Sequence, residues 1–402
     1  MVWLALASLS VALLGAGCGK GTGQGAAGGG PPEVKIGHIH PLTGSMAYEG
    51  GLMRSAIQMC VDEINESGGI KSLGGAKIKL LDGDSQGLPE KAASEAERMI
   101  REGAVALLGT YNSSTAYTAT QIAEKEKVPF VITVAVADDI LERGFKYTFR
   151  IQPRATVMAQ NFISYLKQIK TDDIETIGLI HEETLFGTSI AKYIEQHAAE
   201  AGVKVVANIA YSPKAADLTA EVNKLKGANP DVVVATSYFQ DGCLLAKTLS
   251  ERGVRGKALI GVANGAFSDP KFAATVGEKV AEGVIDINYR ANPKSELTQK
   301  VLARFQEKYG QKLSSHAVYA YMAMRVVADA LERCGSTDPV KLREALAASS
   351  ITDHILPQGP IEFDERGENV NAQAVMIQVQ KGLPVVVLPE EYAEAKLIFP
   401  LR

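Results

Sequence analysis

Cysteine is scarce in this chain: only four of its 402 residues are cysteines. Cys18 closes an apolar N-terminal stretch, which leaves Cys60, Cys243 and Cys334 for the rest of the chain. Three cysteines cannot all pair, and each lies in a run whose apolar residues follow helical spacing. We therefore expect buried free thiols, although a Cys60–Cys334 bridge stays open as an alternative.

The chain also lacks an excess of charge of one sign. Its 42 Lys and Arg against 46 Asp and Glu give a formal net charge of −4, with acids and bases mixed along the sequence. That balance excludes the basic footprint of a nucleic-acid-binding protein. His38 and His40 share one face of a predicted strand, but no third ligand accompanies them. The sequence therefore predicts no metal site and no cofactor.

A recognisable catalytic pattern is missing too. The hydroxyl-rich stretch GTYNSSTA, Gly109 to Ala116, follows the apolar run AVALL but does not match the nucleophile-elbow pattern. No base is evident beside it, and no catalytic constellation stands out elsewhere. We therefore expect a protein that is not an enzyme, and an enzyme is the least favoured function class that we keep open.

The longest apolar run stands at the N-terminus, where VWLALASLSVALLGAGC is uncharged and too short to span a bilayer comfortably. It ends in small residues before Cys18, which is the layout of a secretory signal. The glycine-rich segment that follows cannot bury enough surface to order itself. We predict a signal peptide over residues 1–17, a tether over residues 18–32 and a folded body from about Glu33.

A cysteine at the cleavage point resembles a bacterial lipoprotein signal, in which that cysteine becomes the acylated N-terminus. Two features depart from the pattern: Leu14 lies one place further from Cys18 than the usual leucine, and no Lys or Arg precedes the apolar run. An ordinary cleaved signal with a bystander cysteine is the alternative. We predict lipidation of Cys18, hence an exported protein, periplasmic or at the cell surface, that is anchored in the membrane.

From Val34 onward, strand-like runs rich in Val and Ile alternate with amphipathic helical runs. This rhythm predicts an α/β fold with a parallel sheet covered by helices on both faces. It restarts near residue 175 with five more strand-like runs, which indicates a second doubly wound unit. Near the end, GPIEFDERGEN and AVMIQVQKG are expected to form a strand pair bridged by a polar turn.

Ligands of open α/β sheets bind beyond the carboxyl ends of the strands, so the strand ends are the candidate site. The segments concerned are Pro41–Tyr48, Asp82–Ser85, Thr110–Thr115, Ala135–Asp138, His181–Phe186, Ser237–Asp241 and Ala263–Phe267.

The opening VKIGHIHPLTGSMAYEGGLMRSAIQMCVDEINESGGI resembles the leucine/isoleucine/valine-binding protein family, the type I periplasmic solute-binding proteins of ABC transporters. The resemblance continues through GTYNSSTA, ERGFKYTFR and HEETLFGTSIA and covers about Val34 to Leu388. It implies two Rossmann-like doubly wound lobes joined by three crossovers. The lobes are expected to take residues 34–151 plus 290–356, and residues 152–289 plus 357–402.

The resemblance also implies a role and partners. We expect an extracytoplasmic receptor that captures a small molecule, a branched-chain or other hydrophobic amino acid by family default, and presents it to an ABC permease and ATPase. A ligand-sensing receptor that is not coupled to transport is the alternative, and the expected lipid anchor favours transport.

The loop GTYNSSTA carries the best-matched candidate residues. A helix is predicted to begin there, and its N-terminus offers unpaired N–H groups and the positive end of the helix dipole. Ser113 or Ser114 can cap those groups, or can help hold a carboxylate. In the family this loop grips the carboxylate of the ligand, and Ser113 matches the gripping serine.

Two positions depart from the family pattern. In TVAVADDI, Ala137 stands where the family has a ligand-binding threonine, so only the backbone groups of Ala135 and Ala137 survive as candidates. In GVAN, Ala263 with Asn264 beside it stands where the family has the acid that binds the amine. A buried ammonium without a counter-charge costs several kcal/mol.

Either Asp241 or Glu183 replaces the missing acid, or the ligand has no amine. An aromatic or aliphatic carboxylate, or an amide, is therefore the alternative ligand. Tyr238 matches the cleft tyrosine of the family, and Phe186 and Tyr48 are expected to add stacking surface, with simple core or rim packing as the other explanation.

Overall fold

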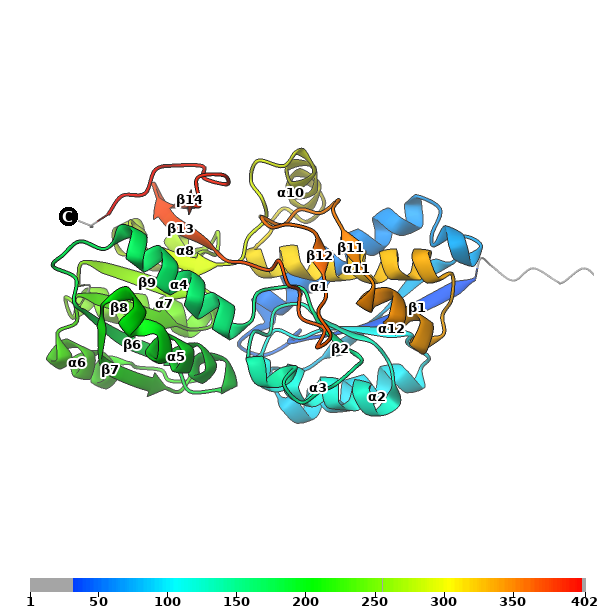
Figure 1. Ribbon diagram of the computed structural model, residues 1–402, viewed down its shortest axis with the longest axis horizontal. Helices are drawn as coiled ribbons and strands as arrows, with labels where there is room; N and C mark the ends of the chain where they lie inside the picture. The colour runs from blue at the N-terminus through cyan, green and yellow to red at the C-terminus, as the bar shows by residue number, and fades with distance from the viewer. Residues whose placement is uncertain (1–31, 255, 400–402) are drawn as a thin grey trace, which may run out of the picture. The chain divides into compact units, whose positions relative to one another are not determined.

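Two sheets organise the chain in the computed structural model, which describes residues 32–254 and 256–399 (Figure 1). The predicted signal peptide, most of the predicted tether and Cys18 lie outside the described residues. The first sheet has five strands and the second has seven, and a short two-stranded sheet accompanies them.

The first sheet has the strand order β2-β1-β3-β4-β5, and all its neighbours are parallel. One face carries Ile36, Leu108 and Val131, which pack in one cluster with residues of α1 and α11. The other face carries Leu107 and Phe130, which pack with α2 and α3. The strands are β1 (Glu33–His40), β2 (Lys77–Asp84), β3 (Ala106–Gly109), β4 (Phe130–Ile132) and β5 (Thr148–Arg150), and the helices are α1 (Ala47–Glu66), α2 (Pro89–Arg101), α3 (Ser113–Glu126), α10 (Glu296–Tyr309), α11 (Ser315–Cys334) and α12 (Pro339–Ala347).

The second sheet has the order β14-β13-β10-β9-β8-β6-β7, parallel from β10 to β7. Its β13 and β14 run antiparallel at one edge. The strands are β6 (Thr176–Glu182), β7 (Lys204–Tyr211), β8 (Val232–Thr236), β9 (Ala258–Val262), β10 (Ile285–Asn288), β13 (Val375–Gln380) and β14 (Leu383–Leu388), and the helices are α4 (Ala155–Ile169), α5 (Leu185–His197), α6 (Thr219–Ala228), α7 (Phe239–Glu251), α8 (Phe272–Val276) and α9 (Glu278–Ala281).

The expected pairing of GPIEFDERGEN with AVMIQVQKG is wrong. In the structure β12 (Ile361–Glu362) pairs with β11 (Ser350–Ile351), and β13 pairs with β10 and β14 instead. The reason is burial: β13 is buried along nearly its whole length and mostly apolar, so a strand pairs with it on each side, whereas β12 has only two residues to offer.

Two doubly wound lobes result, as expected from the sequence, and the chain passes between the sheets after β5, after β10 and between β12 and β13. The first and third of these crossovers pair through their backbones: the Arg150 N–H donates to the Gly367 carbonyl (2.8 Å), and the Asn369 N–H donates to the Arg150 carbonyl (3.0 Å). The residue boundaries of the two lobes remain a prediction.

The three cysteines of the described chain are free, with Cys60 and Cys243 buried and Cys334 half-buried. The expectation of free thiols is confirmed, and the Cys60–Cys334 bridge does not form. Over residues 32–254 and 256–399, no helix combines the length and apolarity that crossing a membrane requires.

Candidate functional site

Strand ends of both sheets meet around one small cavity, which we call the cleft cavity. Its empty space is about 250 Å³, and a water-sized sphere has only about 10 Å³ in which to move, roughly the room that one water needs. A solute of amino-acid size therefore enters only when the lobes separate or the side chains shift. The lining residues are Tyr111, Ser113, Val134, Ala135, Val136, Phe186, Ser237, Tyr238, Ala263, Gly265, Tyr289 and His316.

The cleft cavity carries no formal charge within the described part of the chain. Burial lowers the pKa of His316 to about 4, so its imidazole is neutral near pH 7. Burial also raises the pKa of Tyr111, Tyr238 and Tyr289, so their hydroxyls stay protonated. The cavity therefore offers neutral donors and acceptors and no counter-ion.

Aromatic rings form a continuous wall of this cavity. Ring centroids lie 5.2 Å apart for Phe186 and Tyr238, 5.4 Å for Tyr238 and Tyr111, and 5.1 Å for Tyr111 and His316. Tyr289 continues the wall, 5.7 Å from His316. The Tyr111 hydroxyl is buried and has no hydrogen-bond partner among the described residues. Such a wall suits a flat or branched apolar group, and the orphaned hydroxyl suits a polar atom of the ligand.

Ser113 is the first residue of α3 and is only 1% exposed. Its Oγ accepts a hydrogen bond from the Ala137 N–H at 3.3 Å, which leaves the hydroxyl proton available for donation. The N-cap residue of α3 is Asn112, whose side chain makes no capping bond. Ser113 therefore stands at an uncapped helix N-terminus, where an anionic oxygen is favoured.

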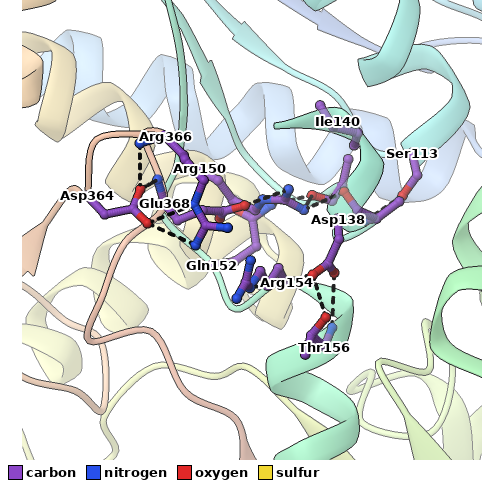
Figure 2. Close-up of polar contacts among 12 residues, drawn as sticks. Ser113, Asp138, Ile140, Arg150, Gln152, Arg154, Thr156, Asp364, Arg366 and Glu368 are labelled. Atoms are coloured by element: carbon purple, nitrogen blue, oxygen red, sulfur yellow. Dashed lines mark hydrogen bonds and ion pairs between the residues drawn. The ribbon is translucent and has the colours of Figure 1, made fainter. Parts of the chain in front are cut away.

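Residues of the first and third crossovers form polar contacts with the loop after β4, as Figure 2 shows. The Arg150 guanidinium, which is fully buried, donates to the carbonyls of Ala135 (3.2 Å) and Ala137 (2.9 Å). Gln152 donates to the same Ala135 carbonyl at 2.8 Å, and Glu368 pairs with Arg150 at 3.0 Å. The loop after β4 and the crossovers thus share one polar network.

This network occupies the backbone groups of Ala135 and Ala137 that were predicted to contact a ligand. Their carbonyls accept from Arg150, the Ala137 N–H donates to Ser113, and the Ala135 N–H donates to the Thr110 carbonyl at 3.2 Å. Ala135 lines the cleft cavity, whereas Ala137 is buried behind it. These backbone groups position Ser113 and the loop, and their predicted contact with a ligand stays a prediction.

The two acids predicted to replace the missing counter-charge lie away from the cavity. Asp241 is 3% exposed and accepts from the Tyr211 hydroxyl (2.9 Å) and from the Tyr238 N–H (3.3 Å) at the start of α7. Burial raises the pKa of Asp241 to about 7. Glu183 is exposed. Neither residue lines the cleft cavity.

Asn264 is also committed to the fold. Its side chain donates to the Ala235 carbonyl (3.2 Å) and accepts from the Ala266 N–H (2.9 Å). The residue is fully buried and does not line the cleft cavity. Ala263 does line it, with a left-handed φ of 52°.

Of the remaining predicted residues, Phe186 and Tyr238 line the cleft cavity, and Tyr48 and Ser114 do not. Tyr48 lies in the first turn of α1, donates to the Asp269 carboxylate at 3.2 Å and packs on Phe239 with a centroid distance of 5.2 Å. It therefore links the first lobe to the second beside the cavity.

Glu49, the residue after Tyr48, adds a second buried carboxyl near Asp269. Glu49 is 2% exposed, and its Oε2, like the Oδ2 of Asp269, has no partner in the described structure. Burial, with the nearby carboxyls of Asp269 and Asp241, raises the pKa of Glu49 to about 8, and burial raises the pKa of Asp269 to about 6. Glu49 therefore carries a proton near pH 7.

Several lining residues were not predicted, and their signals differ in strength. Tyr111 and Ser237 lie in segments that the sequence had marked as strand ends. Tyr289 directly follows β10, an end that the marked segments did not include. His316 comes from α11, and no strand end points to it, so only the tertiary fold brings it to the cavity.

Comparison with known proteins agrees with this architecture. Residues 33–383 match the model of a family described as periplasmic binding protein. The Leu/Ile/Val-binding protein homolog 8 of Brucella abortus is 33% identical over 380 residues, which cover 91% of this chain and 93% of the relative.

Solved structures show the same fold at lower identity. The leucine-binding protein LivK of Thermotoga maritima superposes with a TM-score of 0.78 at 22% identity, covering 88% of this chain and 97% of that one. A solute-binding protein of an ABC transporter from R. palustris, in complex with benzoate, superposes with a TM-score of 0.76 at 19% identity, covering 90% and 98%. These are substrate-binding proteins with the type I two-lobed fold. With the family match spanning most of its length, the chain belongs to the periplasmic binding protein family.

Proposed function

We propose that this protein is the extracytoplasmic solute receptor of an ABC importer and that its ligand is a small aromatic or branched aliphatic carboxylate without an ammonium group. It performs no catalysis in this role. The family membership supports the transport role, and the chemistry of the cleft cavity supports the ligand class.

The observation that carries the ligand class is the pairing of an anion-favouring end with an uncharged remainder. Ser113 and the start of α3 can hold a carboxylate through a hydroxyl, N–H groups and the helix dipole. The rest of the cavity is aromatic and apolar, with Ala263 where an acid would balance an ammonium. An unpaired ammonium there would cost several kcal/mol.

A hydrophobic amino acid is the second candidate, because relatives with at least 30% identity are named as Leu/Ile/Val-binding protein homologs. Its ammonium would have to rely on neutral groups such as the Tyr111 hydroxyl, or on Asp241 after that carboxylate leaves Tyr211. Neutral acceptors stabilise an ammonium less than a carboxylate does.

Export and anchoring through Cys18 belong to the same proposal, supported by the apolar leader and the family. Metabolic labelling with a fatty acid should mark the wild-type protein, and Cys18→Ser should remove the label. Equal labelling of both would remove the anchor from the account and leave the receptor role standing.

Mass spectrometry of the solute that co-purifies with the protein tests the function directly. A carboxylate that rebinds the refolded, ligand-free protein in calorimetry supports the proposal. A sensor that is not coupled to transport would bind the same solute, so uptake of that solute is then compared with and without the permease.

A further inference from the structure

A second and larger cavity opens beside the second crossover, and we call it the crossover cavity. A water-sized sphere has about 430 Å³ in which to move there, against about 10 Å³ in the cleft cavity. It is lined by Pro270, Arg290, Ala291, Pro293, Thr298, Gln299, Leu302, Ala303, Gln306, Lys312, Leu313, Ser315, Val318 and Glu394. None of these residues lines the cleft cavity.

Arg290 brings a positive charge to this lining, and the nearby carboxyls of Glu394, Asp269 and Asp286 offset it only from a distance, without a direct ion pair. Its guanidinium donates to the carbonyls of Ser268 (3.3 Å) and Pro384 (2.9 Å), and within residues 32–254 and 256–399 no carboxylate lies within ion-pair distance of it. Glu394 is the one carboxylate in the lining, and it accepts the Val386 N–H at 2.9 Å. With Lys312, the lining holds two cations against one anion.

Ser315 supplies an unused donor in the same place. It is the first residue of α11, a helix of 20 residues, and is 4% exposed. Its Oγ has no hydrogen-bond partner in the described part of the chain, whereas the neighbouring Ser314 caps the helix by accepting the Ala317 N–H at 3.3 Å. Because buried hydroxyls are nearly always hydrogen-bonded, the Ser315 hydroxyl is free to bind a ligand atom. The positive end of the α11 dipole favours an anion at this position.

The remaining lining is largely apolar and includes Pro293, Leu302, Leu313 and Val318. We propose that the crossover cavity binds a second small organic anion, a carboxylate on a short apolar chain, with its head group on Arg290 and Ser315 and its chain along α10 and α11. This site is separate from the cleft cavity, and the inference does not depend on which solute the cleft takes.

The two cavities are lined by neighbouring residues of the same two segments. Tyr289 lines the cleft cavity while Arg290 and Ala291 line the crossover cavity, and His316 lines the first while Ser315 lines the second. An anion on Arg290 and Ser315 therefore touches the crossover and the helix start that also form the cleft. Any coupling between the two sites is reciprocal, so each ligand would change the affinity for the other by the same factor.

The probe for this site is 6-bromohexanoate, with the neutral 6-bromohexanamide as its matched control. Anomalous scattering from crystals soaked with each probe places the bromine, and equilibrium dialysis measures affinity in solution. We expect bromine in the crossover cavity for the carboxylate, saturable binding in solution, and at least about tenfold weaker binding of the amide, because it forgoes a charge-assisted bond.

Arg290→Gln and Ser315→Ala should each weaken that binding, by at least about tenfold and about fivefold respectively. Arg101→Gln, an exposed arginine on α2, is the matched control and should change nothing. If Arg290→Gln does not fold, Lys312→Gln on the exposed rim replaces it, with an expected loss of about twofold. Bromine in the cleft cavity alone, equal affinity for the amide, or unchanged affinity in both Arg290→Gln and Ser315→Ala would each overturn the proposal.

Discussion

The two halves of the cleft cavity differ in chemistry, although both are built from strand ends of doubly wound sheets. The first-lobe half presents Ser113 at a helix start and is fixed by the buried pair of Arg150 and Glu368. The second-lobe half presents Tyr238 and Ala263, and its acid Asp241 is turned into the start of α7. On the proposed function, the first-lobe half offers donors to an anion, whereas the second-lobe half offers no carboxylate to a cation, and we expect the ligand to show the same asymmetry.

The largest expected effect comes from removing the Arg150–Glu368 ion pair, which fixes the first-lobe half of the cleft cavity. Glu368→Ala leaves Arg150 buried without its counter-charge, which should lower the free energy of unfolding by about 3–5 kcal/mol. Glu365→Ala, an exposed acid in the same turn, is the control. Denaturant unfolding measures both, and a loss below about 1 kcal/mol for Glu368→Ala would mean that this pair does not fix the loop.

The next largest effect is expected from removing the Ser113 hydroxyl, which we propose binds the carboxylate of the ligand. Ser113→Ala should weaken binding of the co-purifying solute by about tenfold or more, because a hydrogen bond to a charged group contributes about 1.5–3 kcal/mol. Ser114→Ala removes a hydroxyl from the same helix turn outside the cavity and should stay within about twofold of wild type. Calorimetry decides, and equal losses in the two variants would count against a specific role for Ser113.

A third change introduces a carboxylate into the second-lobe half of the cleft cavity, at Ala263. Ala263→Glu places a carboxylate at the second-lobe wall, so the preference for leucine over its deaminated acid should rise by about tenfold or more. Ala263→Gln, with the same shape and no charge, is the control. A preference that rises equally in both variants would show that shape, and not charge, sets the selection.

The smallest expected effect concerns pH. Glu49 is buried against Asp269, Asp241, Lys271, Tyr48, Tyr111 and Cys243. Its pKa is about 8 in this structure against an ordinary 4.5, so the buried Glu49 keeps a proton that it would lose if separation of the lobes hydrated it. Separation of the lobes is expected to hydrate Glu49 only in part, so ligand affinity should weaken as pH rises from about 4.5 to 8, by less than about tenfold over the whole range.

Glu49→Gln should flatten that dependence, and Glu66→Gln, an exposed acid at the other end of α1, should leave it unchanged. Titrations between pH 5 and pH 9 measure the slope. The same slope in wild type and Glu49→Gln would place the titrating group elsewhere.

Much of this architecture follows from the sequence. Alternating Val- and Ile-rich strands and amphipathic helices predicted both doubly wound units. The strand ends were predicted to form the site, and four candidate residues from them line the cleft cavity, namely Ser113, Ala135, Phe186 and Tyr238. Asp241, Asn264 and Ala137 were also marked by strand ends, but their groups are used within the fold. The sequence shows that a residue lies at a strand end, but it does not show which groups of the folded protein form hydrogen bonds with that residue.

The parts that the sequence did not predict depend on contacts between distant segments. His316 lies at a helix start more than 200 residues from Ser113, and the Arg150–Glu368 pair joins two crossovers. The pairing of β13 with β10 and β14 was missed for the same reason, since partner choice depends on burial in the assembled sheet.

The most direct test of the central claim is a paired calorimetric titration of the ligand-free protein with leucine and with 4-methylpentanoate, its deaminated acid. Both share one apolar chain and one carboxylate, so only the ammonium differs. The uncharged cleft cavity predicts that 4-methylpentanoate binds at least as tightly as leucine. Leucine binding at least about tenfold tighter than 4-methylpentanoate would contradict the account and would show that the cleft holds an ammonium after all.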